Sequence, residues 1–250
     1  MRSDIAIRVV TIVSLAAALC AEAIPAKARG RRRGRTTGMV LEAPFEGKRV
    51  CIMNGQSRVG SEVFESIAKE FAETVWFKVE IVHGAASPKT VLLNGTVGLV
   101  VCVEESEDAP ALLIAPENGW AKVNVAKLAT DNLDADILGQ RVKREIWRAV
   151  AYALGAGNER IPSVLSPVET TADLDALPST PTPEAFNTIL QAAEARGIGK
   201  IRFVPYRRAC EEGWAPAPTN DAQKAIWEQV KADKERGPTN PITIEPPKKK

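Results

Sequence analysis

The sequence predicts an α/β fold with a mixed, partly parallel sheet, a crossover helix, a long central helix and a helical C-terminal extension. Three observations support this class. A buried-strand pattern is followed by an amphipathic helix, a continuous β-branched run is typical of a central strand, and the longest helical pattern comes after the strands. The chain has 250 residues, of which 45% are hydrophobic, and this composition excludes a fully disordered or collagen-like protein.

The first half of the chain alternates between strand and helix patterns. Residues 49–54 form an apolar run, and from residue 59 to 71 apolar side chains recur every three or four positions. A half-buried strand is predicted over 76–82 and a central one over 97–103. Because a helix connects the first two strands, we expect them to be parallel and joined by a right-handed crossover.

The second half contains shorter strands and the longest helix. Two short strands are predicted at 112–115 and 121–125, the latter at the edge of the sheet. A helix over 136–154 has a clear apolar stripe and ends in a glycine-rich turn. Further along, the sequence predicts two more helices with a short strand between them, at 183–196, 201–204 and 220–235.

Both ends of the chain lie outside this domain pattern. Residues 1–28 are typical of a secretory signal peptide, with cleavage after Ala23 or Ala28, so we expect a secreted, periplasmic or cell-envelope protein. The remaining divisions are an arginine-rich disordered linker over 29–46, an α/β domain over 47–168, a helical region over 169–237 packed on it, and a lysine-rich disordered tail over 238–250.

Basic charge is concentrated in the two tails, and the domain between them is acidic. The N-terminal arginines could bind an anionic surface such as lipid headgroups or acidic glycan, without specific recognition of nucleic acid. Such a glycine-broken run is equally consistent with a solvated tether. The residues of this run are Arg29, Arg31, Arg32, Arg33 and Arg35.

The histidine and cysteine counts limit the possible chemistry. His83 is the only histidine, which excludes any metal or catalytic site that needs two imidazoles. The mature chain would keep Cys51, Cys102 and Cys210, whose spacing fits no metal knuckle, and whether two of them form a disulfide stays open. Cys51 and Cys102 lie in strand-like runs and are expected to be buried thiols. No cofactor is expected.

One segment of the longest helix has the spacing of a metal site without its ligands. It runs Arg144-Glu145-Ile146-Trp147-Arg148, where a His-Glu-x-x-His helix would place two histidines on one face and a glutamate as general base. With its element order, this segment resembles the zincins, in particular the archaemetzincin-like metzincins, over residues 48–168. The resemblance implies a degenerate zinc peptidase, because Leu154 stands where a third ligand would lie.

The same helix permits two interpretations of its charged residues. Arg141, Arg144 and Arg148 fall on one side of the apolar stripe, and Glu145 lies between them and the core. They could form an ordinary surface ion cluster, or they could line a retained cleft that binds an anionic ligand such as a peptide C-terminus.

The sequence therefore predicts a non-catalytic, exported binding or scaffold protein. It would be a pseudo-metallopeptidase that binds a protein, peptide or glycan of the cell envelope. Two alternatives of other classes remain. One is a hydrolase that uses a cysteine nucleophile with His83, and the other is an envelope-adhesion protein that acts through the basic tail.

Overall fold

The computed structural model describes residues 40–84, 87–129 and 133–236. The predicted signal peptide, the five arginines of the basic run and the lysine-rich tail lie outside these residues. Within the described ranges, no helix combines the length and the apolar character needed to cross a bilayer.

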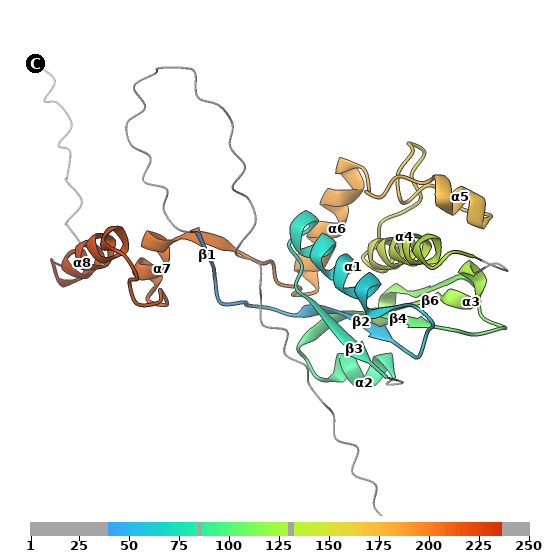
Figure 1. Ribbon diagram of the computed structural model, residues 1–250, viewed down its shortest axis with the longest axis horizontal. Helices are drawn as coiled ribbons and strands as arrows, with labels where there is room; N and C mark the ends of the chain where they lie inside the picture. Colours follow the sequence, from blue (N-terminus) through green and yellow to red (C-terminus); the bar gives the residue numbers. More distant parts are fainter. Residues whose placement is uncertain (1–39, 85–86, 130–132, 237–250) are drawn as a thin grey trace, which may run out of the picture. The chain divides into compact units, whose positions relative to one another are not determined.

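A five-stranded mixed sheet forms the centre of the fold, in the order β3-β2-β4-β6-β5 (Figure 1). The strands β2, β3, β4 and β6 are parallel, and only β5 runs antiparallel to its neighbour β6. The predicted fold class and the parallel first strands are thus confirmed. The strands are β2 Arg49–Asn54, β3 Val79–His83, β4 Val97–Glu104, β5 Leu112–Ala115 and β6 Trp120–Asn124.

The prediction that the strand at 121–125 lies at the sheet edge is wrong. β6 is hydrogen-bonded on both sides, and β5 is the edge strand. The reason is the short 3-10 turn Pro116–Asn118, after which Gly119 takes a left-handed conformation (φ 70°) and folds β5 back along β6. Val125 starts the short helix α3 (Val125–Leu128) and is not part of the strand.

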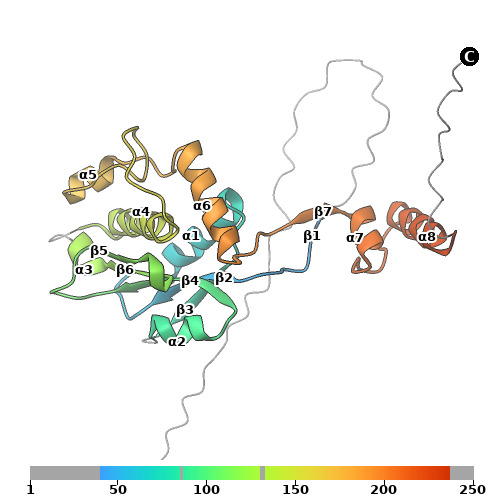
Figure 2. The same cartoon turned by 180° about the vertical axis from the view of Figure 1, so that it is seen from behind.

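Two helices cover one face of the sheet and build the main core. They are α1 (Ser61–Thr74) and α4 (Ala135–Ala153), and the views in Figures 1 and 2 place both on the side opposite α2 (Pro88–Leu93). The α2 helix was not predicted, because its six residues are too few to show helical periodicity.

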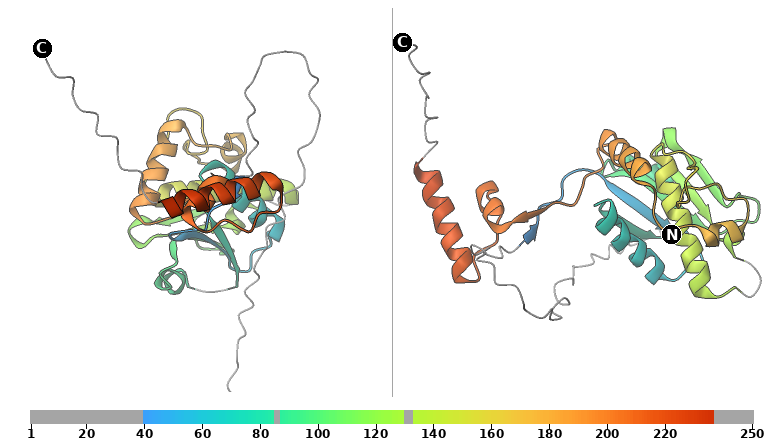
Figure 3. Two further views of the ribbon diagram at one scale, coloured as in Figure 1. Left: turned by 90° about the vertical axis from the view of Figure 1, so that its left-hand side faces the viewer. Right: turned by 90° about the horizontal axis from the view of Figure 1, so that it is seen from above.

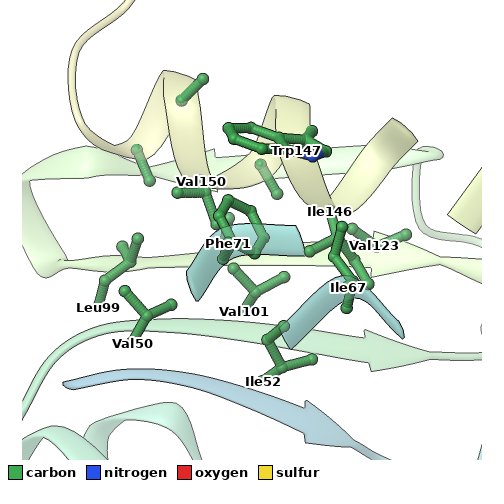
Figure 4. Packing of buried hydrophobic residues seen from close by; sticks show 14 of the residues in the cluster. Val50, Ile52, Ile67, Phe71, Leu99, Val101, Val123, Ile146, Trp147 and Val150 are labelled. Atoms are coloured by element: carbon green, nitrogen blue, oxygen red, sulfur yellow. The ribbon is translucent and has the colours of Figure 1, made fainter. Parts of the chain in front are cut away.

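The main core consists of apolar side chains from the sheet, α1 and α4 (Figure 4). The rings of Phe71 and Trp147 pack with centroids 4.2 Å apart, and the Trp147 indole N–H donates to Glu70 Oε1 at 2.7 Å. Each fully buried side chain contributes about 1.5–3 kcal/mol relative to an exposed one. The residues labelled in Figure 4 are Val50, Ile52, Ile67, Phe71, Leu99, Val101, Val123, Ile146, Trp147 and Val150.

The C-terminal region contributes to two different clusters. The helices α5 (Thr171–Ala176) and α6 (Pro183–Ala195) place Leu174 and Ile189 in the main core. Three elements follow, β7 (Phe203–Pro205), α7 (Tyr206–Glu212) and α8 (Asp221–Arg236), which are drawn in Figure 3. The helices α7 and α8 form a smaller hydrophobic cluster of Tyr206, Cys210 and Val230. The predicted boundary at residue 168 stays a prediction.

The predicted disordered linker over 29–46 is wrong at its C-terminal end. Residues Val40–Glu42 form strand β1, which pairs antiparallel with β7. Leu41 packs against the smaller cluster around Tyr206, and this apolar contact gives the segment a fixed partner.

Candidate functional site

The charged side of α4 is buried. Asp134 caps the helix by accepting a hydrogen bond from the Asp136 N–H. Two turns later Arg141, Glu145 and Arg148 are only 6%, 3% and 6% exposed. The surface ion cluster predicted as one interpretation of the sequence is therefore wrong, because α3, α5 and the segment that follows α4 contact this side of the helix.

Arg148 connects α4 to the turn that follows it. Its Nη1 donates to the backbone oxygens of Val164, at 3.1 Å, and Ser166, at 2.7 Å. Its Nε lies 3.3 Å from Glu145 Oε1 as an ion pair, one helical turn back. The guanidinium plane is also 5.3 Å from the ring centroid of Tyr152. One buried cation thus holds a helix and a loop together.

Arg141 makes an equivalent connection at an earlier position on α4. Its Nε and Nη2 donate to Asp175 Oδ1 and Oδ2, at 2.8 and 2.6 Å, in the two-pronged geometry typical of arginine and carboxylate. Its Nη1 donates to the Leu128 oxygen at the end of α3, at 2.8 Å. The arginine lowers the pKa of the Asp175 carboxyl below its ordinary value by hydrogen bonding to it. Arg141 therefore ties α3, α4 and α5 together.

Glu145 lies in the least polar surroundings of the group. Burial raises the pKa of its carboxyl, and the nearby Arg148 acts in the opposite direction. Within the described part of the chain, its Oε2 has no hydrogen-bond partner, and the Nε atoms of Arg144 and Arg148 also lack one, although Arg148 Nε is ion-paired. A buried carboxylate with a single charged partner depends on that partner for its stability.

The predicted anion-binding residues are thus not equivalent. Arg141 and Arg148 donate to groups of the protein itself, whereas Arg144 is partly exposed and makes no ion pair within 4 Å among the described residues. Binding of an anion by these three arginines stays a prediction. Arg144 is the one among them whose partly exposed guanidinium could donate hydrogen bonds to a ligand.

A second polar connection, which the sequence did not predict, holds the loop that follows α4 in the chain. Glu159 accepts hydrogen bonds from the hydroxyls of Ser163 and Thr182 and, at 3.2 Å, from the Thr182 N–H. Thr182 is also the N-cap of α6. Because these partners are up to 23 residues apart, no local spacing could reveal them. A capping box at Thr170 and Asp173 is the one local signal that could have placed α5.

The residues present do not fit a zinc site. Guanidinium groups carry only hydrogen-bond donors and stay protonated, so Arg144 and Arg148 cannot be ligands at the positions that the resemblance assigns to histidines. Leu154, at the third position, is buried and apolar. Among the residues that the structure describes, no three His, Cys, Asp or Glu side chains are grouped as metal ligands.

The residues of the alternative hydrolase lie in different environments, because the histidine is exposed and the three cysteines are buried. His83 is exposed at the end of β3, with its ring edge against Phe64 at 6.4 Å between centroids. Cys51, Cys102 and Cys210 are buried free thiols. Burial raises the pKa of Cys51 to about 12 and that of Cys102 to about 11, which is opposite to the activation a nucleophile needs.

Fold and site together define an α/β domain with a mixed five-stranded sheet and a long helix whose charged side is buried. No protein-family model matches the sequence, and no curated protein matches it either.

Three solved structures are similar to this chain, and two of them are archaemetzincins. The archaemetzincin of Methanopyrus kandleri has a TM-score of 0.48 and 14% identity, over 59% of this chain and 96% of that one. A zinc-dependent peptidase of Methanocorpusculum labreanum has a TM-score of 0.45 and 13% identity, over 56% of this chain and 99% of that one. The archaemetzincin of Archaeoglobus fulgidus, complexed with malonate, has a TM-score of 0.43 and 16% identity, over 56% of this chain and 99% of that one. These likenesses concern the fold alone.

Proposed function

We propose that this protein is a non-catalytic binding or scaffold module, a pseudo-metallopeptidase on a zincin-like domain. The observation that carries the proposal is the position of Arg148. At a place where the resembled motif has a metal ligand, this side chain is buried, donates to the backbone oxygens of Val164 and Ser166, and forms an ion pair with Glu145. In this protein, residue 148 therefore connects α4 to the loop that contains Val164 and Ser166.

The proposal includes export and a ligand of the cell envelope. Export is supported by the apolar run that follows Arg8, and N-terminal sequencing of the mature chain tests it, since a start at Met1 would overturn it. A peptide or glycan with an anionic group is the ligand class that suits the free donors of Arg144. The cysteine hydrolase gains no support, because all three thiols are buried and burial raises the pKa of Cys51 and Cys102.

Zinc content and peptide cleavage of the full chain test the non-catalytic role. We expect less than stoichiometric zinc after dialysis and no cleavage of a mixed peptide library. Glu145→Gln removes the one carboxylate at the general-base position, and Glu169→Gln changes an exposed carboxylate as the matched control. Stoichiometric zinc together with hydrolysis that Glu145→Gln abolishes, and Glu169→Gln leaves intact, would overturn the proposal.

A further inference from the structure

A pocket opens on the face of the sheet opposite α1 and α4, where α2 begins. It is lined by Met53 and Cys102 from the adjacent strands β2 and β4, and by Glu104 and Lys122 at its rim. Because β2, β3 and β4 are parallel, their carboxyl ends meet at this edge of the sheet. The pocket is separate from the buried charges of α4, so a ligand bound in it would be independent of the proposed function.

Two sulfur atoms form the apolar side of this pocket. Met53 and Cys102 are direct partners in the register of β2 and β4, so their side chains lie next to each other on one face. The Cys102 thiol donates to the Met53 thioether, with Sγ and Sδ 3.7 Å apart. Cys51 belongs to the same hydrophobic cluster but is fully buried and does not line the pocket.

We propose that Met53 and Cys102 bind one Cu(I) ion. Thiolate and thioether are soft ligands, and this pair selects Cu(I) over the harder divalent ions. With metal–sulfur bonds of about 2.3 Å, a sulfur separation of 3.7 Å gives an angle of about 107° at the metal. That angle leaves one side of the ion open to the pocket, where a water molecule or a small solute completes its coordination.

The charge balance also favours a monovalent soft ion. Binding replaces the Cys102 thiol proton by Cu(I), the proton leaves to solvent, and no oxidation state changes. The resulting thiolate–Cu(I) pair is neutral, so this mostly apolar pocket gains no net charge. Lys122, the cross-strand partner of Cys102 on β6, is held at the rim by Glu104 at 2.8 Å. A zinc ion would need two further ligands and would keep a positive charge.

Competition with the Cu(I) chelator bicinchoninate, without oxygen and with ascorbate present, tests the proposal on the full chain. We expect one Cu(I) per chain, with one proton released to solvent for each ion bound. Met53→Leu keeps the side-chain volume and removes the thioether, and we expect at least tenfold weaker binding. Cys102→Ala should abolish binding.

Cys210→Ser is the matched control, since Cys210 is a buried thiol in a different cluster. It should bind Cu(I) as the unchanged chain does. Circular dichroism confirms the fold of each variant, and Met53→Leu decides the question if Cys102→Ala does not fold. Failure of the chain to compete with the chelator, equal binding by Met53→Leu, or loss of binding in Cys210→Ser would each overturn the proposal and leave the sulfur pair as core packing only.

Discussion

Replacing Arg148 by methionine is the strongest test of the idea that a buried cation holds α4 to its loop. The change removes the donors to Val164 and Ser166 and leaves Glu145 without its ion-pair partner. Breaking a buried ion pair from one side costs about 3–5 kcal/mol, because the remaining charge stays buried. We expect a loss of that size in the free energy of unfolding at pH 7, measured by urea denaturation.

The pH dependence of this loss identifies its cause. Burial raises the pKa of Glu145 above its ordinary value of 4.5. A carboxyl with a raised pKa in the folded state binds its proton more tightly there, so its contribution favours folding at low pH and is lost as the pH rises. Without Arg148 the pKa rises further. The deficit of Arg148→Met relative to the unchanged chain should therefore shrink when the pH is lowered from 7 to about 4.5.

Two further variants complete the experiment. Glu145→Gln combined with Arg148→Met removes both charges, and we expect it to recover more than half of the loss, since buried pairs can be replaced at little cost. Arg144→Gln is the matched control, because Arg144 is partly exposed and has no ion-pair partner within 4 Å among the described residues. A loss for Arg148→Met within about 0.5 kcal/mol, as for surface substitutions, would refute the reasoning.

Two other predictions concern the remaining buried groups. Asp175→Asn should cost about 1 kcal/mol at pH 7, since the carboxylate is partly exposed. Because Arg141 lowers the pKa of Asp175 from 3.8, the stabilisation is fully present above that pH and is lost as the pH falls through the lower pKa of the folded protein. The urea midpoints of the two proteins should therefore converge as the pH is lowered below 3.8. Burial raises the pKa of Cys51 to about 12 and that of Cys102 to about 11. Both thiols should therefore react with iodoacetamide at pH 8 at least a hundredfold more slowly in the native chain than in the denatured chain. Rapid labelling of either thiol in the native chain would contradict their burial.

The parts of the fold that have strong local patterns could be predicted from the sequence. The β-branched run of β4 and the apolar stripe of α4 each require burial along a whole element, and both were placed within about two residues. The edge position of β5 could not be predicted in the same way. Its four residues and those of β6 have similar patterns, and the order of the two strands is decided by pairing across the sheet.

The candidate site was predictable only in its position along the chain. The spacing placed Arg144, Glu145 and Arg148 on one helix side, but burial of that side depends on partners 16 to 18 residues away for Arg148 and 34 residues away for Arg141. Such partners leave no periodic signal in the sequence. The sulfur pair was missed for the same reason, because strand register, and not residue spacing, brings Met53 to Cys102.

The connection made by Arg148 also constrains how this chain could evolve. Histidines at 144 and 148 would restore the ligand spacing, but the second change would remove the donors on which the turn around Val164 depends. A chain passing through that state would lose stability before it gained a metal, since the third position, Leu154, is still apolar and buried. Gain of a metal site in this helix therefore requires several changes together, and the change at Arg148 alone is disfavoured by selection for a stable fold.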